Sequence, residues 1–149
     1  MQQIYNFFEG FADDSRVWIY TANRPLDPTE AVFVQENLDS FANHWKAHGS
    51  QLKAKARMMN EFTIVFVVDQ DQAEASGCSV DSSVRFVKEI GKELNVDFFN
   101  RLNVLIETDN RERKLHPYRK LSELPSGYAY YNPLVQSLKE LKEEWYVVK

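Results

Sequence analysis

The spacing of hydrophobic positions along the chain predicts four strands. Bulky residues alternate with period two over Arg16 to Thr21, and the apolar run from Phe62 to Asp69 has the strongest strand character in the chain. A weaker alternation over Gln51 to Met59 and a further apolar run over Leu102 to Glu107 predict two more strands. These four segments are the candidate members of one sheet.

Two segments between these strands have the period of amphipathic helices. The first is predicted to begin after an N-cap at Thr29 and to end near His48, where Gly49 supplies the stop. The second is predicted to run from about Val80 to Leu94. Their apolar stripes are predicted to be Val34, Leu38, Phe41 and Trp45 in the first helix, and Val80, Val84, Val87, Gly91 and Leu94 in the second.

The order strand, helix, strand, strand, helix, strand predicts an α+β protein with the ferredoxin-like βαββαβ fold. In that fold both helices lie on one face of an antiparallel sheet, and right-handed crossovers give the strand order 4-1-3-2. A chain of 149 residues suits one domain. Residues 15–107 would form the ferredoxin-like core, and residues 108–149 a C-terminal extension.

Both faces of the central strands are apolar, so the face without helices needs a cover. We expect Trp18, Tyr20, Val65 and Val67 on that second face. The C-terminal extension is one candidate cover, with a predicted strand over Tyr128 to Tyr131 and a helix beginning at Asn132-Pro133. That helix would present Leu134, Leu138, Leu141 and Trp145. The other candidate is a second copy of the chain, which would make a homodimer through this face.

Composition and charge narrow the class of protein. The 18 basic and 22 acidic residues give a net charge of −4, and no basic stripe indicates a nucleic-acid partner. The single cysteine excludes an internal disulfide and suits a reducing compartment, so a cytoplasmic location is expected. The N-terminus lacks the pattern of a secretory signal, and no apolar run is long enough for a membrane span.

The stretch SGCSVDSS, from Ser76 to Ser83, gathers serine hydroxyls, a carboxylate and the only cysteine at the start of the second helix. In an antiparallel helix pair the end of the first helix, with His44 and His48 one turn apart, meets that start. The strand that ends at Asp69 also reaches this rim, together with Asp71. The candidate ligand-binding residues of the rim are Ser76, Gly77, Ser79, Asp81, Ser82 and Asp69.

Four interpretations of this rim stay open. In the structural one, Ser79 is an N-cap, Asp81 favours the positive end of the helix dipole and Cys78 is a small buried hydrophobe. In the second, the amide groups of 78–81 and the hydroxyls bind an anion or small ligand. In the third, His44 and His48 bind a metal ion with Cys78 or Asp81. In the fourth, Cys78 is a nucleophile and His48 or His44 its base, although no known cysteine-enzyme signature surrounds it.

A fifth alternative needs no rim chemistry. If Trp18, Tyr20, Val65 and Val67 form a flat exposed patch, the protein is an interaction module without catalysis. A concave pocket with clustered histidine, cysteine and aspartate side chains would instead favour ligand binding.

The segments SRVWIY, HWKAHG, SGCSVDSSVRF and NVLIE together resemble a small bacterial family of the Bacteroidota, often labelled "ABC transporter ATPase" by automatic annotation. The resemblance covers about Ser15 to Glu107, and it implies no catalytic roles because the family has no established activity. The ATPase label conflicts with the residues. A phosphate-binding loop needs G-x-x-x-x-G-K before Ser or Thr, whereas Gly91-Lys92 precedes Glu93 inside a predicted helix. We therefore reject the label, and a role beside a transporter stays open.

Overall fold

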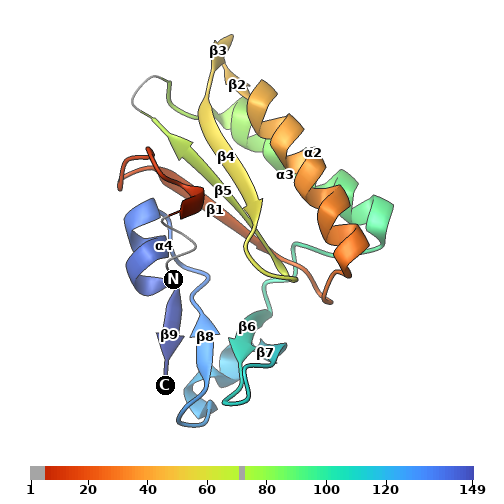
Figure 1. The fold of residues 1–149 in the computed structure, drawn as a ribbon, viewed down its shortest axis with the longest axis vertical. Helices are drawn as coiled ribbons and strands as arrows, with labels where there is room; N and C mark the ends of the chain where they lie inside the picture. The colour runs from red at the N-terminus through yellow and green to blue at the C-terminus, as the bar shows by residue number, and fades with distance from the viewer. Residues whose placement is uncertain (1–5, 71–72) are drawn as a thin grey trace.

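The computed structural model describes residues 6–70 and 73–149, and it contains two main antiparallel sheets with helices packed around them (Figure 1). The elements are β1 (Arg16–Thr21), α2 (Pro28–His44), β2 (Lys46–Ala47), β3 (Ser50–Gln51), β4 (Lys53–Met58), β5 (Thr63–Asp69), α3 (Gly77–Leu94), β6 (Asn103–Glu107), β7 (Arg113–Pro117), the 3₁₀ helix η1 (Tyr118–Glu123), β8 (Ala129–Tyr131), α4 (Leu138–Glu144) and β9 (Tyr146–Val148).

The α+β class is confirmed, but the single ferredoxin-like sheet is not what forms. The first sheet has the order β1-β5-β4, which is the predicted arrangement of the first three strands. The fourth predicted strand, β6, lies instead inside a second sheet of order β7-β6-β8-β9. A small hairpin of β2 and β3 makes up the remaining sheet structure in the described residues.

The partners of β6 come from the chain that follows it. A short turn after Glu107 brings β7 back alongside β6 in a register of five residue pairs, and β8 occupies its other edge. Its middle residues, Val104, Leu105 and Ile106, are all buried, so both faces of β6 are covered. Pairing with a strand that follows after a short turn costs little loop-closure entropy, and it keeps β6 away from β1.

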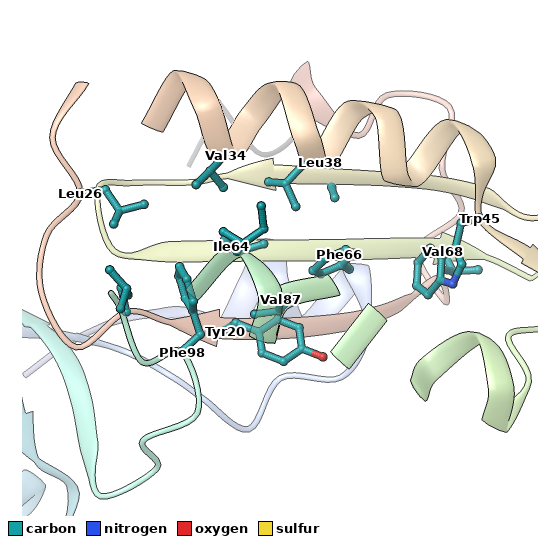
Figure 2. Packing of buried hydrophobic residues seen from close by; sticks show 14 of the residues in the cluster. Tyr20, Leu26, Val34, Leu38, Trp45, Ile64, Phe66, Val68, Val87 and Phe98 are labelled. Atoms are coloured by element: carbon teal, nitrogen blue, oxygen red, sulfur yellow. The ribbon is translucent and has the colours of Figure 1, made fainter. Parts of the chain in front are cut away.

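The helices α2 and α3 are antiparallel on one face of the first sheet, as predicted. The indole Nε1 of Trp45, which ends α2, donates to the carbonyl of Ser79 in the first turn of α3 at 2.9 Å. Arg24, just before α2, donates to the carbonyl of Leu94 at the end of α3 at 2.7 Å. Figure 2 shows Val34 and Leu38 pointing from α2 toward the sheet, where Ile64 and Phe66 of β5 belong to the same buried cluster.

Two details of these helices differ from the prediction. An Asp27–Glu30 capping box starts α2 with Pro28 at the first helical position, so Asp27 rather than Thr29 is the N-cap. In α3 Val80 and Val84 are only half-buried, and the buried stripe is Ser79, Ser83, Val87, Ile90 and Gly91. Gly91 is required there, because a Cβ atom would lie 2.5 Å from the carbonyl oxygen of Val96.

The C-terminal segment covers the other face of the first sheet, as predicted, and Val65 and Val67 lie on that face, but the prediction is wrong for Trp18 and Tyr20. Trp18 is the register partner of Phe66, and partners in an antiparallel pair share a face, so Trp18 and Tyr20 point toward the helices. From β1 the second face presents Val17, beside Val65 and Val67 of β5. These pack against a cluster that includes Leu138, Leu141 and Trp145.

The chain's own residues thus occupy the face for which a second copy was the alternative cover. The covering helix α4 begins later than predicted, at Leu138 with Ser137 as N-cap. The residues before it make a turn at Pro133 and Leu134, and Ser137 then bridges to Arg16 of β1. Leu134 consequently stays 66% exposed and takes no part in the cover.

Candidate functional site

The start of α3 is built as a helix cap. Ser76 is the N-cap: its Oγ accepts from the N–H of Ser79 at 3.1 Å, and the Ser79 Oγ accepts from the N–H of Ser76 at 2.6 Å. This reciprocal pair is a capping box with serine in both positions. The helix therefore starts at Gly77, three residues before the predicted start, and Ser79 is inside it rather than at the cap.

The other hydroxyls of the stretch are also engaged by the helix backbone. Ser82 Oγ donates to the carbonyl of Ser79 at 2.8 Å, and Ser83 Oγ donates to that of Val80 at 2.6 Å. Cys78 is exposed rather than a buried hydrophobe, and it lines a shallow hollow with Asp81, Val84 and Arg85. Gly77 faces open space, where a side chain would meet no neighbour.

The two histidines are not one turn apart on a helix. Trp45 leaves the helix in an extended conformation, with φ −77° and ψ 126°, and buries its indole under α3. The helix therefore ends at His44, whose Nδ1 lies 2.8 Å from the carbonyl oxygen of Ser40. His48 is in the tight turn between β2 and β3, where it and Gly49 have φ values of 51° and 80°.

Asp69 lies on the face of the first sheet that points away from α2 and α3. It shares the face of Val65 and Val67, is 3% exposed, accepts from the N–H of Ala12 at 3.2 Å and forms a salt bridge with Lys53 at 3.4 Å. Asp71 lies outside the described residues. Across residues 6–70 and 73–149, no group of three histidine, cysteine, aspartate or glutamate side chains is placed to hold a metal ion.

The structure thus divides the predicted rim. His44 and Ser82 line one groove of about 480 Å³ between the two helices, together with Lys46 and the aromatic rings of Phe41 and Phe86. Cys78 and Asp81 line the separate hollow on α3, and His48 lies at the tip of the hairpin. Only the pair His44 and Ser82 therefore shares a concave surface.

A second surface, absent from the sequence prediction, lies along the free edge of β1. Alternate residues of β1 bond to β5, and the continuing bond from Ala22 N to the Phe62 carbonyl shows that these are the even-numbered ones. Val17, Ile19 and Thr21 therefore direct their backbone groups away from the sheet. Val17 N donates to the Gln136 carbonyl at 3.0 Å. Beyond it, the N–H and C=O groups of Ile19 and Thr21 have no hydrogen-bond partner among the described residues.

This open edge forms the floor of a groove of about 510 Å³, which we call the β1 groove. Its walls come from the α3–β6 connection, the start of η1 and the turn before α4. The lining residues are 17–21, 98–101, 103, 118 and 133–136. Leu134 and Tyr118 line it with exposures of 66% and 41%, and Leu102, between the lining residues Arg101 and Asn103, is 80% exposed. These are three of the five large hydrophobic side chains that are exposed in the described part of the chain.

The other edge of the same sheet is capped at one point by a side chain. The side-chain amide of Gln35, on α2, donates from Nε2 to the Ala56 carbonyl at 3.1 Å and accepts from the N–H of Met58 at 2.9 Å. It thereby occupies two of the outward backbone groups of β4 as a neighbouring strand would. Proteins usually protect sheet edges in such ways, and no side chain caps the outward groups of Ile19 and Thr21 in the described residues.

The β1 groove depends on the departure of β6. A ferredoxin-like sheet would place its fourth strand beside β1, so the sequence prediction left no room for a groove at this edge.

Comparison of the chain with protein-family models, curated proteins and solved structures gives no match. None of the helices in residues 6–70 and 73–149 has the length and apolar character needed to cross a bilayer.

Proposed function

We propose that this protein is an interaction module that binds an extended segment of a partner protein along the edge of β1. The observation that carries the proposal is the pairing of an open strand edge with an apolar groove. An added strand would bond to the outward groups of Ile19 and Thr21 and continue the line that Gln136 and Ser137 begin beside Arg16 and Val17.

The backbone contacts alone would give weak binding. Ile19 and Thr21 offer an N–H and a C=O each, and a net hydrogen bond contributes about 0.5–1.5 kcal/mol. The sum, about 2–6 kcal/mol, falls short of the roughly 8 kcal/mol of a micromolar complex. Apolar side chains of the partner must therefore contact the exposed Leu134 and Tyr118 as well.

Selection of peptides tests the proposal. A phage library of random linear dodecapeptides is panned on the intact chain, and the selected peptides are synthesised and measured by fluorescence polarisation. Ile19→Pro removes the outward N–H without removing a bond to β5, because proline is tolerated where an edge N–H faces outward. We expect this variant to lose most peptide binding.

The matched control is Ala54→Pro, which removes an outward N–H from β4, the opposite edge of the same sheet. It should bind the peptides as the unchanged protein does. Both variants are first compared by circular dichroism and thermal unfolding. Peptides that bind equally to Ile19→Pro, or selection of no peptide at all, would reject the proposed function.

A second candidate function concerns the groove between α2 and α3. His44, Lys46 and Ser82 line it together. The imidazole, the ammonium group and the hydroxyl can each donate a hydrogen bond to a small anion. Titration with inorganic phosphate, followed by NMR of the His44 imidazole, tests this. A saturable shift that Lys46→Ala weakens supports the anion site, and an unchanged spectrum rejects it.

A further inference from the structure

The β1 groove differs in charge from the rest of the molecule. The chain has 22 acidic residues and a net charge of −4, yet no carboxylate lines this groove. Arg101 is the one charged residue in its lining. The lining of the β1 groove therefore carries a positive charge and no carboxylate, although the protein as a whole is acidic.

The Arg101 charge acts on the strand itself. Burial raises the pKa of the Tyr20 hydroxyl, while a hydrogen bond to Ser83 and the positive charge of Arg101 oppose that shift. Arg101 is exposed, and no carboxylate in the described residues forms an ion pair with it. The guanidinium is therefore available for a ligand and close enough to affect β1.

A second guanidinium lies at the beginning of the same strand. The Arg16 guanidinium carbon is 4.5 Å from the ring centroid of Trp18, a lining residue of the groove. The salt bridges among the described residues do not include Arg16 either. Trp18 and Tyr20 point to the same face of β1, so both cations act on that face.

We propose that the segment bound in the β1 groove carries carboxylates on alternate residues. This inference rests on the proposed function and names the chemistry of its partner. Successive residues of an added strand point to opposite faces. Side chains on the face of Trp18 and Tyr20 meet Arg16 and Arg101, and those on the other face meet the apolar Ile19 and Val135. The partner segment therefore alternates acidic and apolar side chains.

The peptide selection tests this pattern directly. Peptides selected on the unchanged protein should be enriched in Asp or Glu at every second position, with Val, Ile, Leu or aromatic residues between them. A synthetic peptide in which each glutamate becomes glutamine should bind at least tenfold more weakly. Comparing free-acid and amidated C-termini separates side-chain carboxylates from a terminal one. If only the terminal carboxylate matters, the alternating pattern is rejected.

Charge reversal in the protein gives the complementary measurement. Arg101→Glu should weaken binding of the acidic peptides at least tenfold, and panning on this variant should select lysine or arginine instead. Arg85→Glu is the control, because Arg85 is an exposed arginine on α3 outside the β1 groove lining. It should change binding by less than twofold, since an exposed charge outside the groove lining is screened by salt.

The outcomes separate the two proposals. Peptides that depend on Ile19 but show no acidic preference, and bind Arg101→Glu unchanged, reject the carboxylate inference and leave the proposed function standing. Failure of every peptide to depend on Ile19 rejects both. Sedimentation that shows self-association abolished by Ile19→Pro would make a second copy the occupant, and the inference of an acidic partner segment would then be wrong.

Discussion

Arg113 and Glu61 join the two sheets through a bidentate ion pair. Nε and Nη2 of the Arg113 guanidinium donate to the two carboxylate oxygens of Glu61, each at 2.8 Å. Glu61 lies in the turn between β4 and β5, and Arg113 begins β7 of the second sheet. Arg113 also reaches the buried Glu107 of β6 at 3.5 Å. One side chain thus links the second sheet to the end of the first, beside the hydrophobic cluster that the two sheets share.

A double-mutant cycle with Arg113→Lys and Glu61→Gln measures this link. Both side chains are about a third exposed, so we expect a coupling free energy of unfolding of about 0.5–1 kcal/mol, near the upper end for surface pairs. Additive effects of the two substitutions would show that the pair contributes nothing to the junction.

The same pair gives a pH dependence. The hydrogen bonds from Arg113 hold the pKa of Glu61 below its ordinary 4.5. A carboxylate with a lowered folded pKa stabilises the fold above its unfolded pKa, and this contribution is lost as the pH falls through the folded value. Glu61→Gln should therefore destabilise the protein at pH 7 and have a smaller effect below about pH 4. An equal effect at both pH values would contradict the ion pair.

Tyr131 and Tyr146 support a buried carboxylate in the second sheet. Glu107 is 6% exposed and accepts from the hydroxyls of Tyr131 at 3.1 Å and Tyr146 at 2.7 Å. Tyr131→Phe removes one donor from this buried charge, and we expect a loss of about 1–3 kcal/mol of unfolding free energy at pH 7. The half-exposed Tyr118→Phe serves as the control and should stay within about 0.5 kcal/mol.

Alkaline pH gives an independent test of Tyr131. Burial is the main effect that raises the pKa of Tyr131 to about 12, against 10.0 for a free tyrosine. The charge of Glu107 acts in the same direction, and a hydrogen bond to Arg113 acts in the opposite direction. Since the folded pKa is raised, this stabilising contribution is present below pH 10 and declines from there toward about pH 12. Chemical denaturation between pH 9 and 11.5 should show a shallower decline in Tyr131→Phe. An identical slope would place Tyr131 outside the buried network.

Strands β1, β4, β5 and β6 were predictable because each has a period-two or continuous apolar pattern, although that of β4 is weaker. Arg16 to Thr21 was predicted with the bounds of β1, and the segments predicted for β4, β5 and β6 differ from them by a few residues at most. Their partners were not predictable from the pattern. An apolar run such as Leu102 to Glu107 indicates that both faces of a strand are buried. It does not indicate which sheet the strand joins. The β7 segment RKLHP, with charged residues along it, has too weak an apolar pattern to reveal the strand that captures β6.

Trp45 is one reason why the residues of the candidate rim are not brought together. Trp45 fits the apolar stripe of α2 by spacing, but it buries its indole by leaving the helix, and this carries His48 into the hairpin turn. The prediction that Trp18 and Tyr20 share a face with Val65 and Val67 is also wrong. Alternation within each strand was right, but only the register, which pairs Trp18 with Phe66, shows which faces coincide.

Substitution by alanine should have different effects at two leucines of the C-terminal segment. Leu138 is fully buried against the second face of the first sheet, so Leu138→Ala should cost about 2–5 kcal/mol of unfolding free energy. Leu134 is 66% exposed in the β1 groove, so Leu134→Ala should change stability by less than about 0.5 kcal/mol and weaken peptide binding. Urea denaturation and fluorescence polarisation measure the two effects. Similar losses of stability would show that Leu134 belongs to the core.

Removal of the whole cover gives the stronger form of the same prediction. A chain that ends at Asn132 would lack α4 and expose Val17, Val65 and Val67. We expect it to aggregate or to unfold at a markedly lower temperature. A truncated chain that remains monomeric and equally stable would contradict the assigned cover.

Gln35 should control self-association through β4. Its amide occupies the outward Ala56 carbonyl and Met58 N–H, and it also donates to Asp39 at 2.8 Å. Gln35→Ala removes this cap and leaves an open edge, so we expect a loss of about 1–2 kcal/mol and concentration-dependent association seen by sedimentation velocity. Gln35→Glu loses the donor and places a carboxylate beside the Ala56 carbonyl and Asp39, and should destabilise at least as much at pH 7.

The control for this prediction is Glu36→Ala, an exposed substitution at the next position of α2 that touches neither backbone group. It should remain monomeric with little change in stability. The variants also test the contrast on which the β1 groove rests. If Gln35→Ala stays monomeric at the concentrations at which peptides bind beside Ile19, an exposed strand edge alone does not attract another chain. Specific recognition at β1 would then come from the side chains that line its groove, Arg101 and Leu134 above all.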